Sequence, residues 1–126
     1  MYLLDTNVLI YFLHGNEKVA NILSLLLQEV FFISSMTRFE AEVGIEKEDI
    51  DHDIWLDGLD EFIQIPFDAK IVKIAVPLFI SMGSKRHMFK DAIIAATAIA
   101  HDMTLITADK DFTRIPGLKY CLVELE

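Results

Sequence analysis

The sequence predicts an α/β domain with a mostly parallel central sheet flanked by helices on both faces, a three-layer α/β/α arrangement. Short apolar runs typical of strands alternate along the chain with longer segments whose apolar residues have helical spacing. Parallel strands need crossover connections, and helices in those connections cover the faces of the sheet. Of the 126 residues, 53% are hydrophobic, which is enough for one core, so we expect a single domain over residues 1–126.

The first expected strand and helix follow directly on one another. Residues 2–5, "YLLD", form a short apolar run that ends in an acid and indicates a strand. Residues 6–15, "TNVLIYFLHG", have apolar side chains at helical spacing. Thr6 or Asn7 is suited to cap this helix, and Gly15 is suited to end it.

The next segments repeat the alternation of helix and strand. Residues 16–29 have the pattern of an amphipathic helix, and residues 30–34, "VFFIS", form a continuous apolar run that indicates a buried strand. Residues 35–45 begin with Ser35 and Thr37, both capping types, and indicate the start of a helix.

A charge-rich connection or helix end is expected at residues 45–53, "IEKEDIDHD". Residues 54–67 indicate a short helix and then a strand near "FIQI". Residues 68–83, "DAKIVKIAVPLFISMG", indicate a helix that we expect to be bent or broken at Pro77.

The last third of the chain contains one more helix and two strands. Residues 89–102 predict a helix whose small apolar stretch "AIIAATAIA" suits close packing on a sheet. Residues 104–107, "TLIT", and residues 119–125, "KYCLVEL", predict the last two strands.

Charge and cysteine content limit the possible settings. The formal net charge of −9 argues against broad electrostatic binding of nucleic acid and fits acids that bind metal, a basic partner, or simple solubility. The single cysteine, Cys121, excludes an intramolecular disulfide and favours a reducing, cytoplasmic setting. We expect no signal peptide, because Asp5 interrupts the apolar N-terminus, and no membrane span, because no apolar run is long enough.

Four acids are expected at one edge of the predicted sheet. Asp5 ends the first strand, Asp109 follows "TLIT" by two residues, Asp91 lies in the first turn of its helix, and Glu40 lies near the start of the helix after "VFFIS". Open parallel sheets bind their ligands beyond the carboxyl ends of the strands. Each acid also has an ordinary structural role available, as a helix cap, a first-turn acid, a turn residue or a solvated side chain.

Carboxylates that converge repel one another and cannot all stay ionised without a cation. Oxygen ligands without a cysteine or histidine pattern point to Mg²⁺ or Mn²⁺ rather than zinc. These ions polarise phosphate groups and lower the pKa of a bound water, so the matching reaction is hydrolysis of a phosphodiester. Glu42 is a rival to Glu40, and Asp111 is a rival to Asp109.

A small basic cluster precedes Asp91. It contains Lys85, Arg86, His87 and Lys90, and it is either a solvated loop or a contact for a phosphate backbone beside the acids. Other reaction classes lack their motifs: the chain has no Gly-x-Ser-x-Gly, no glycine fingerprint for a dinucleotide and no phosphate-binding loop.

Three segments together resemble a known family. They are "LLDTNVLIYFL" at residues 3–13, "ISSMTRFEAEVG" at residues 33–44 and "KDAIIAATAIAHDMTLITADKDFTRIPGLK" at residues 90–119. The chain resembles the PIN-domain ribonucleases, most closely the VapC toxins of VapBC toxin–antitoxin pairs. The resemblance implies an endoribonuclease that depends on one or two Mg²⁺ or Mn²⁺ ions. It also implies a homodimer and a small antitoxin partner that places a basic segment near the acids.

The same resemblance implies roles for particular residues. Asp5, Glu40, Asp91 and Asp109 match the metal-binding acids of the family, and Thr6, Asn7 and Thr107 match polar residues that support the site. Asp111 remains an alternative fourth acid. Lys90 and Arg38 depart from the family pattern, and Lys90 is placed to pair with Asp91 or to touch RNA. An antitoxin-independent nuclease of RNA processing and a non-catalytic interaction module of the same fold are the alternatives.

Overall fold

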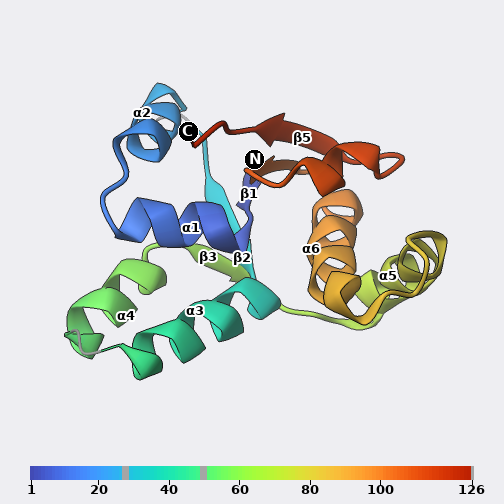
Figure 1. The fold of residues 1–126 in the computed structure, drawn as a ribbon, viewed down its shortest axis with the longest axis horizontal. Helices are drawn as coiled ribbons and strands as arrows, with labels where there is room; N and C mark the ends of the chain where they lie inside the picture. The colour runs from blue at the N-terminus through green and yellow to red at the C-terminus, as the bar shows by residue number, and fades with distance from the viewer. Residues whose placement is uncertain (27–28, 49–50, 126) are drawn as a thin grey trace.

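The central feature is a five-stranded sheet in which every pairing among the described strands is parallel. The computed structural model describes residues 1–26, 29–48 and 51–125. The strand order is β3-β2-β1-β4-β5 (Figure 1). The strands are β1 (Tyr2–Leu4), β2 (Phe31–Ser34), β3 (Ile63–Ile65), β4 (Thr104–Thr107) and β5 (Lys119–Leu122). The predicted parallel α/β fold is therefore confirmed.

Helices cover both faces of this sheet. They are α1 (Thr6–Leu13), α2 (Glu17–Leu25), α3 (Ser35–Lys47), α4 (His52–Asp60), α5 (Ala69–Ser81) and α6 (Phe89–Ala100), with short 3₁₀ turns η1 (Arg86–Met88) and η2 (Lys110–Arg114). In Figure 1, α1 to α4 lie on one side of the sheet, and α5 and α6 lie on the other. The expected three layers are thus present.

Alternation along the central strands divides the core between the two faces. Leu4 and Ile106 pack with residues of α1, α2 and α3, whereas Leu3 and Leu105 pack with residues of α6 and η2. Successive side chains of a strand point to opposite faces, so a strand buried on both sides is apolar throughout. This burial explains why the residues that face the two cores, Leu3, Leu4, Leu105 and Ile106, are all aliphatic.

Helix α6 is buried from two directions, which accounts for its small residues. Ala95 and Ala98 face the sheet core, while Ala96 packs with Ile71 and Ala75 of α5. All three of these α6 alanines are fully buried. Small side chains let the helix lie close to both neighbours, so the core role expected for this stretch is confirmed.

Several boundaries differ from those expected. Helix α5 runs through Pro77 without a break, and its packing on α6 offsets the hydrogen bond that the proline removes. The cap of α3 is Ser34, whose Oγ accepts from the Thr37 amide at 3.0 Å, rather than Ser35. The expected helix over residues 16–29 ends at Leu25. Positions 27–28 of it and positions 49–50 of the charged connection lie outside the described residues.

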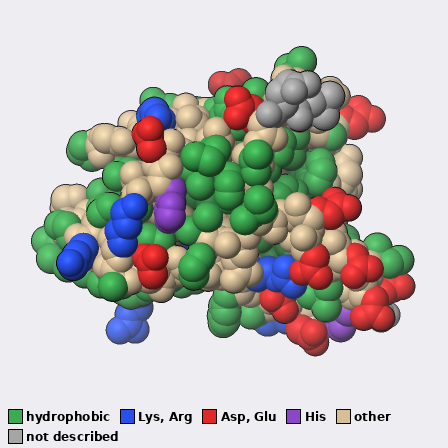
Figure 2. Space-filling view, turned by 180° about the vertical axis from the view of Figure 1, so that it is seen from behind, with side chains coloured by type: hydrophobic (Ala, Val, Ile, Leu, Met, Phe, Trp, Pro, Cys, Tyr) green, Lys and Arg blue, Asp and Glu red, His purple; other side chains and the backbone are tan. Residues whose placement is uncertain are grey.

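The surplus negative charge is concentrated away from the sheet edge that carries the candidate acids. Glu46, Glu48, Asp51 and Asp53 are exposed at the end of α3 and the start of α4. Seen from behind, acidic side chains gather at the lower right, over the α3–α4 region (Figure 2). The net charge of −9 therefore describes the whole surface rather than the candidate site. No helix in the described part of the chain has the length and apolar character needed to cross a membrane.

A leucine pair tests the assignment of the core. Leu4 lies in the central strand with 0% exposure, and Leu25 at the end of α2 is 83% exposed. Leu4→Ala is expected to lower the free energy of unfolding by about 2–5 kcal/mol, because it leaves a cavity. Leu25→Ala should change it by less than about 0.5 kcal/mol. Urea denaturation followed by circular dichroism measures both, and equal losses would contradict the burial assigned to Leu4.

Candidate active site

The candidate site lies where the strand order changes direction. Strands β2 and β3 lie on one side of β1 in the sheet, and β4 and β5 lie on its other side. The carboxyl ends of β1 and β4 therefore flank a switch point, which is the common ligand position in open parallel sheets. Leu4 pairs with Ile106 in register, so the next residues, Asp5 and Thr107, lie side by side.

Asp5 is held at this point by both of its carboxylate oxygens. Oδ1 accepts from the Thr6 amide at 2.8 Å, which makes Asp5 the N-cap of α1, and Oδ2 accepts from Thr107 Oγ1 at 2.8 Å. The residue is only 5% exposed. Burial raises its pKa, the two hydrogen bonds oppose that rise, and the charges of Asp109 and Glu40 add to it. Asp5 is thus both a helix cap and a buried member of an acidic cluster.

Thr107 connects Asp5 to Asp109. While its hydroxyl donates to Asp5, its Oγ1 accepts from the Asp109 amide at 3.0 Å. Asp109 Oδ1 in turn accepts from the Asp111 amide at 2.9 Å and caps η2. Thr107 is fully buried, so its position, and with it the turn that carries Asp109, is set by the core.

Glu40 enters the cluster from α3. Its Oε1 accepts from Thr6 Oγ1 at 2.8 Å. Thr37 Oγ1 lies 3.0 Å from Thr6 Oγ1 and 3.2 Å from Ser34 Oγ, so a row of hydroxyls joins the start of α1 to the start of α3. Sequence reasoning did not assign Ser34 and Thr37 to the site. The available signal was a serine and a threonine three residues apart directly after a parallel strand.

Asp91 is the acid on which the other charges act. Burial raises its pKa to about 7, and the charges of Asp5, Asp109, Asp111 and Glu40 contribute in that order. Among the described residues, no hydrogen bond reaches its carboxylate, and the N-cap of α6, Met88, has no side-chain acceptor. The four acids predicted from the sequence therefore lie near enough to one another that the charges of Asp5, Glu40 and Asp109 act on Asp91.

Lys90 pairs with Glu40. Its Nζ donates to Glu40 Oε2 at 2.6 Å, and the lysine side chain stays 53% exposed. The sequence left open a pairing with Asp91 or a contact to RNA, and the structure instead directs the ammonium group across to α3. A cation in the first turn of a helix lies at the positive end of the helix dipole, so the Glu40 carboxylate offsets an unfavourable position.

The rival acids are placed less centrally. Arg38 pairs with Glu42 and Asp60 at 2.7 Å each, which joins α3 to α4 and engages Glu42 outside the cluster. Asp109 raises the pKa of both Asp5 and Asp91, whereas Asp111 is exposed and acts only on Asp91. Electrostatics therefore favours Asp109 over Asp111 as the fourth acid.

Two grooves lie near the acids, one lined in part by Asp111 and the other in part by Asp109. One, of about 460 Å³, is lined by Lys85, His87 and Arg114 together with Asp111. The other, of about 680 Å³, is lined by residues that include Asn7, Tyr11 and Asp109. Arg86 is exposed in η1 beside the first groove. The expected basic cluster thus lies next to the acids, and Asn7 faces solvent rather than the core.

The donor set fits a hard divalent cation. It consists of carboxylates that repel one another, with hydroxyls from Thr6 and Thr107 that orient two of them. In the described part of the chain, no three aspartate, glutamate, histidine or cysteine side chains are gathered closely enough to hold an ion without moving. Asp91 and Asp109 are partly buried, whereas Asp5 is buried and held by hydrogen bonds to both of its oxygens.

Comparison with known proteins identifies the class. The model of the PIN domain family matches residues 2–118, so the chain belongs to the PIN domain family, whose members are nucleases. No curated protein matches the sequence.

Solved structures narrow the likeness. A toxin–antitoxin complex from Klebsiella pneumoniae is 32% identical, with a TM-score of 0.79, covering 94% of this chain and 95% of that one. VapBC2 from Rickettsia felis, bound to a DNA fragment from their promoter, is 27% identical with a TM-score of 0.82 and 98% coverage of each chain. FitAcB from Neisseria gonorrhoeae is 26% identical with a TM-score of 0.79, covering 95% and 96%. The resemblance to VapBC proteins inferred from the sequence is confirmed.

The raised pKa of Asp91 predicts a pH dependence of stability. In the unfolded chain Asp91 has its ordinary pKa of 3.8, and in the fold its pKa is about 7. Between these values the folded protein keeps a proton that the unfolded chain has released, so stability falls as pH rises through this window. Asp91→Asn removes this penalty. Its gain in Tm over the unsubstituted protein should therefore be larger at pH 8 than at pH 5.

Thermal melts in a chelating buffer measure this gain. Asp102→Asn is the matched control, because its pairing with Lys119 lowers the pKa of Asp102, so this substitution should bring no gain at pH 8. An Asp91→Asn gain that is the same at both pH values would contradict the assignment.

Proposed function

We propose that this chain is a metal-dependent endoribonuclease and the toxin of a type II toxin–antitoxin pair. The observation that carries the proposal is the convergence of four carboxylates from α1, α3, α6 and the end of β4 at one switch point. Membership of a nuclease family and likeness to solved toxin–antitoxin complexes support it. The same acids would suit an antitoxin-independent nuclease, and the likeness to solved toxin–antitoxin complexes is what favours the toxin over it. The presence of all four acids argues against the non-catalytic module.

The acids Asp5, Glu40, Asp91 and Asp109 are proposed as the metal centre. A bound Mg²⁺ or Mn²⁺ ion would compensate their charge, polarise a phosphate and lower the pKa of a water. Asp5 is the fixed member, because Thr6 and Thr107 hold both of its oxygens. Asp91 and Asp109 are the more adjustable members, since both are only partly buried and Asp109 has one oxygen, Oδ1, in a hydrogen bond.

Substrate binding is proposed at the basic groove beside this centre. No ion pair among the described residues involves Lys85 or Arg86, and both are exposed next to the acids. Such side chains contact phosphates without reading sequence. Because the acidic surplus lies over the α3–α4 region, RNA can approach this groove despite the net charge of −9.

The same acids suit the proposed antitoxin. A basic segment that enters the groove beside Asn7 and Asp109 would place a cation against the cluster and compete with a metal ion for it. This mode of neutralisation needs a site that attracts cations, and the charges of Asp5, Asp109, Asp111 and Glu40, which add to burial in raising the pKa of Asp91, support it.

Asp5→Asn tests the nuclease. The amide keeps the size of the side chain and removes the charge, so cleavage of total RNA with Mg²⁺ or Mn²⁺ should fall at least about 100-fold, while the fold is retained. Asp102→Asn should cleave at the rate of the unsubstituted protein, because Asp102 lies before the amino end of β4 and the acids lie beyond its carboxyl end. Sequencing of the cut ends identifies the target RNA. Equal cleavage by Asp5→Asn and the unsubstituted protein would overturn the assignment, and no cleavage by any form would favour the non-catalytic module.

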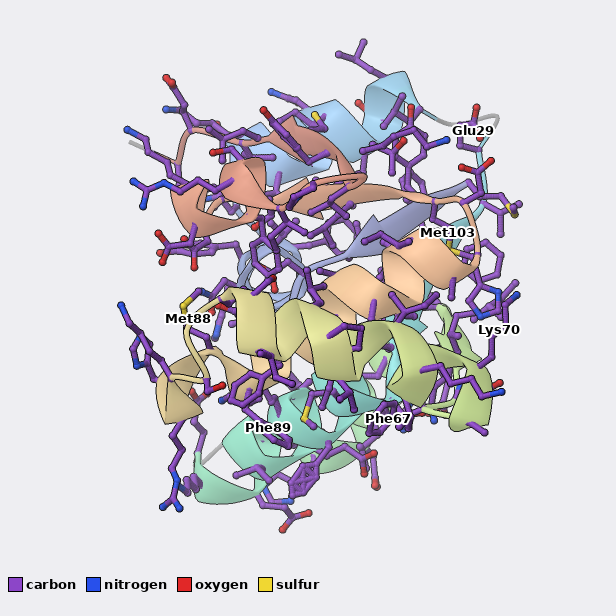
Figure 3. All side chains as sticks on the ribbon, turned by 90° about the vertical axis from the view of Figure 1, so that its right-hand side faces the viewer. Glu29, Phe67, Lys70, Met88, Phe89 and Met103 are labelled. Carbon is purple, nitrogen blue, oxygen red and sulfur yellow. The ribbon has the colours of Figure 1, made fainter. Side chains whose placement is uncertain are left out.

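A homodimer is proposed through the outer face of α5. Val72, Val76 and Ile80 are 40%, 53% and 62% exposed and repeat at intervals of four residues, so they form one apolar stripe. Phe67 and Phe89 are also exposed and lie just below α5 in Figure 3. Together these five side chains border one apolar groove. An exposed patch of this kind is typical of an interface.

Val76→Glu tests the dimer. A charge in the middle of the stripe is expected to convert the dimer to a monomer, which size-exclusion chromatography with light scattering detects. Val30→Glu is the control, since Val30 is similarly exposed at 46% but lies before β2. A dimer that survives Val76→Glu, or a monomeric unsubstituted protein, would contradict this interface.

A further inference from the structure

Both oxygens of the Glu40 carboxylate accept a hydrogen bond from the protein, and one of the two donors is a cation. Its Oε1 accepts from Thr6 Oγ1 at 2.8 Å, and its Oε2 accepts from Lys90 Nζ at 2.6 Å. A charge-assisted bond of this length is among the stronger hydrogen bonds of proteins. Each oxygen keeps a second lone pair, as the oxygens of Asp5 do, but a metal ion at Glu40 would lie beside the positively charged Lys90 ammonium group and be repelled by it.

Among the described residues, no lysine or arginine pairs with the other three acids, and Asp5 is held by an amide and a hydroxyl, which are neutral donors. Asp109 has one oxygen, Oδ1, in a hydrogen bond with the Asp111 amide, and within the described ranges no donor reaches the Asp91 carboxylate. Neither carboxylate forms an ion pair with a described lysine or arginine. Positive charge inside the cluster is thus supplied at one position, the Glu40 side, by Lys90.

The position of Lys90 in the fold also indicates that its charge serves the acidic cluster. It lies in the first turn of α6, where the helix dipole disfavours a cation, and directly before Asp91. Lys90 and Glu40 are fifty residues apart in sequence, so their ion pair depends on the tertiary arrangement of α3 and α6. The side chain stays 53% exposed, while its ammonium group reaches the Glu40 carboxylate on α3.

We propose that Lys90 is a built-in counter-cation that holds Glu40 away from the metal, so that the site takes a single divalent ion on Asp5, Asp91 and Asp109. This inference rests on the proposed nuclease function, because it concerns the same acids. Lys90 is then a positioning residue that acts through Glu40, and it lowers the affinity of the site for metal. The lysine also keeps the metal-free cluster one charge less negative.

Metal binding without RNA tests the inference. Mn²⁺ is titrated into metal-free protein by calorimetry, which reports both stoichiometry and Kd. The unsubstituted protein is expected to bind one ion. Lys90→Gln should bind Mn²⁺ about tenfold more tightly, or bind a second ion, because a nearby positive charge is lost and Glu40 is released. Lys90→Arg keeps the charge and should stay close to the unsubstituted protein.

Lys119→Gln is the matched control. Lys119 Nζ pairs with Asp102 at 2.7 Å, nearly the same distance as in the Lys90–Glu40 pair, but at the opposite end of α6. Figure 3 shows this separation: Phe89, next to Lys90, and Met103, next to Asp102, lie at opposite ends of the helix. Lys119→Gln should leave the affinity for Mn²⁺ unchanged.

The double variant Glu40→Gln/Lys90→Gln tests whether Glu40 coordinates the metal ion. It replaces an ion pair of zero net charge by two neutral amides. If Glu40 does not coordinate the ion, the Kd should stay within about threefold of that of the unsubstituted protein. If Glu40 is a ligand, the double variant should bind at least about tenfold more weakly.

The outcomes distinguish this inference from the nuclease proposal. Two ions bound by the unsubstituted protein, an unchanged Kd in Lys90→Gln, or weak binding by the double variant would overturn the role of Lys90 and leave the nuclease intact. No binding by the unsubstituted protein, with Asp5→Asn indistinguishable from it, would overturn the metal centre and this inference together.

Discussion

The burial of one carboxylate, that of Asp5, determines how the rest of the site is built. A charge that is 5% exposed must be hydrogen-bonded, and the chain satisfies both oxygens with the Thr6 amide and the Thr107 hydroxyl. Those two bonds tie the start of α1 to the end of β4. The turn that carries Asp109 and the hydroxyl row that leads to Glu40 both begin at these same threonines.

The cost of this arrangement is burial and repulsion of charge, and it falls mostly on Asp91. Its pKa rises to about 7 first because the carboxylate is partly buried and then because the charges of four other acids act on it. A protein that tolerates such a charge arrangement gains a strong preference for cations at one point. Two cations can offset this negative charge. One is the Lys90 ammonium group, which pairs with Glu40, and the other is an external cation at the remaining acids.

Several features followed from residue type and spacing alone. The alternation of apolar strands with helical segments predicted the parallel sheet, and the positions of Asp5 and Asp109 after their strands predicted the edge at which they meet. The partner of Lys90 did not follow, because Glu40 is far away in sequence and the choice depends on how α3 and α6 pack. Pro77 was expected to disturb α5, yet packing on α6 keeps that helix continuous.

The sequence by itself determined which carboxylates stand at element ends, since strand and helix boundaries are set by local pattern and capping. It also determined that a chain with 53% hydrophobic residues would bury its strands on both faces. Only the tertiary structure decided which hydrogen-bond and ion-pair partners each carboxylate has. The parallel register brings the Thr107 hydroxyl to the Asp5 carboxylate. The packing of α3 near α6 pairs Lys90 with Glu40, and no donor reaches the Asp91 carboxylate in the described chain. These partners depend on distances between charged groups that are far apart in sequence, and no local sequence pattern encodes such distances.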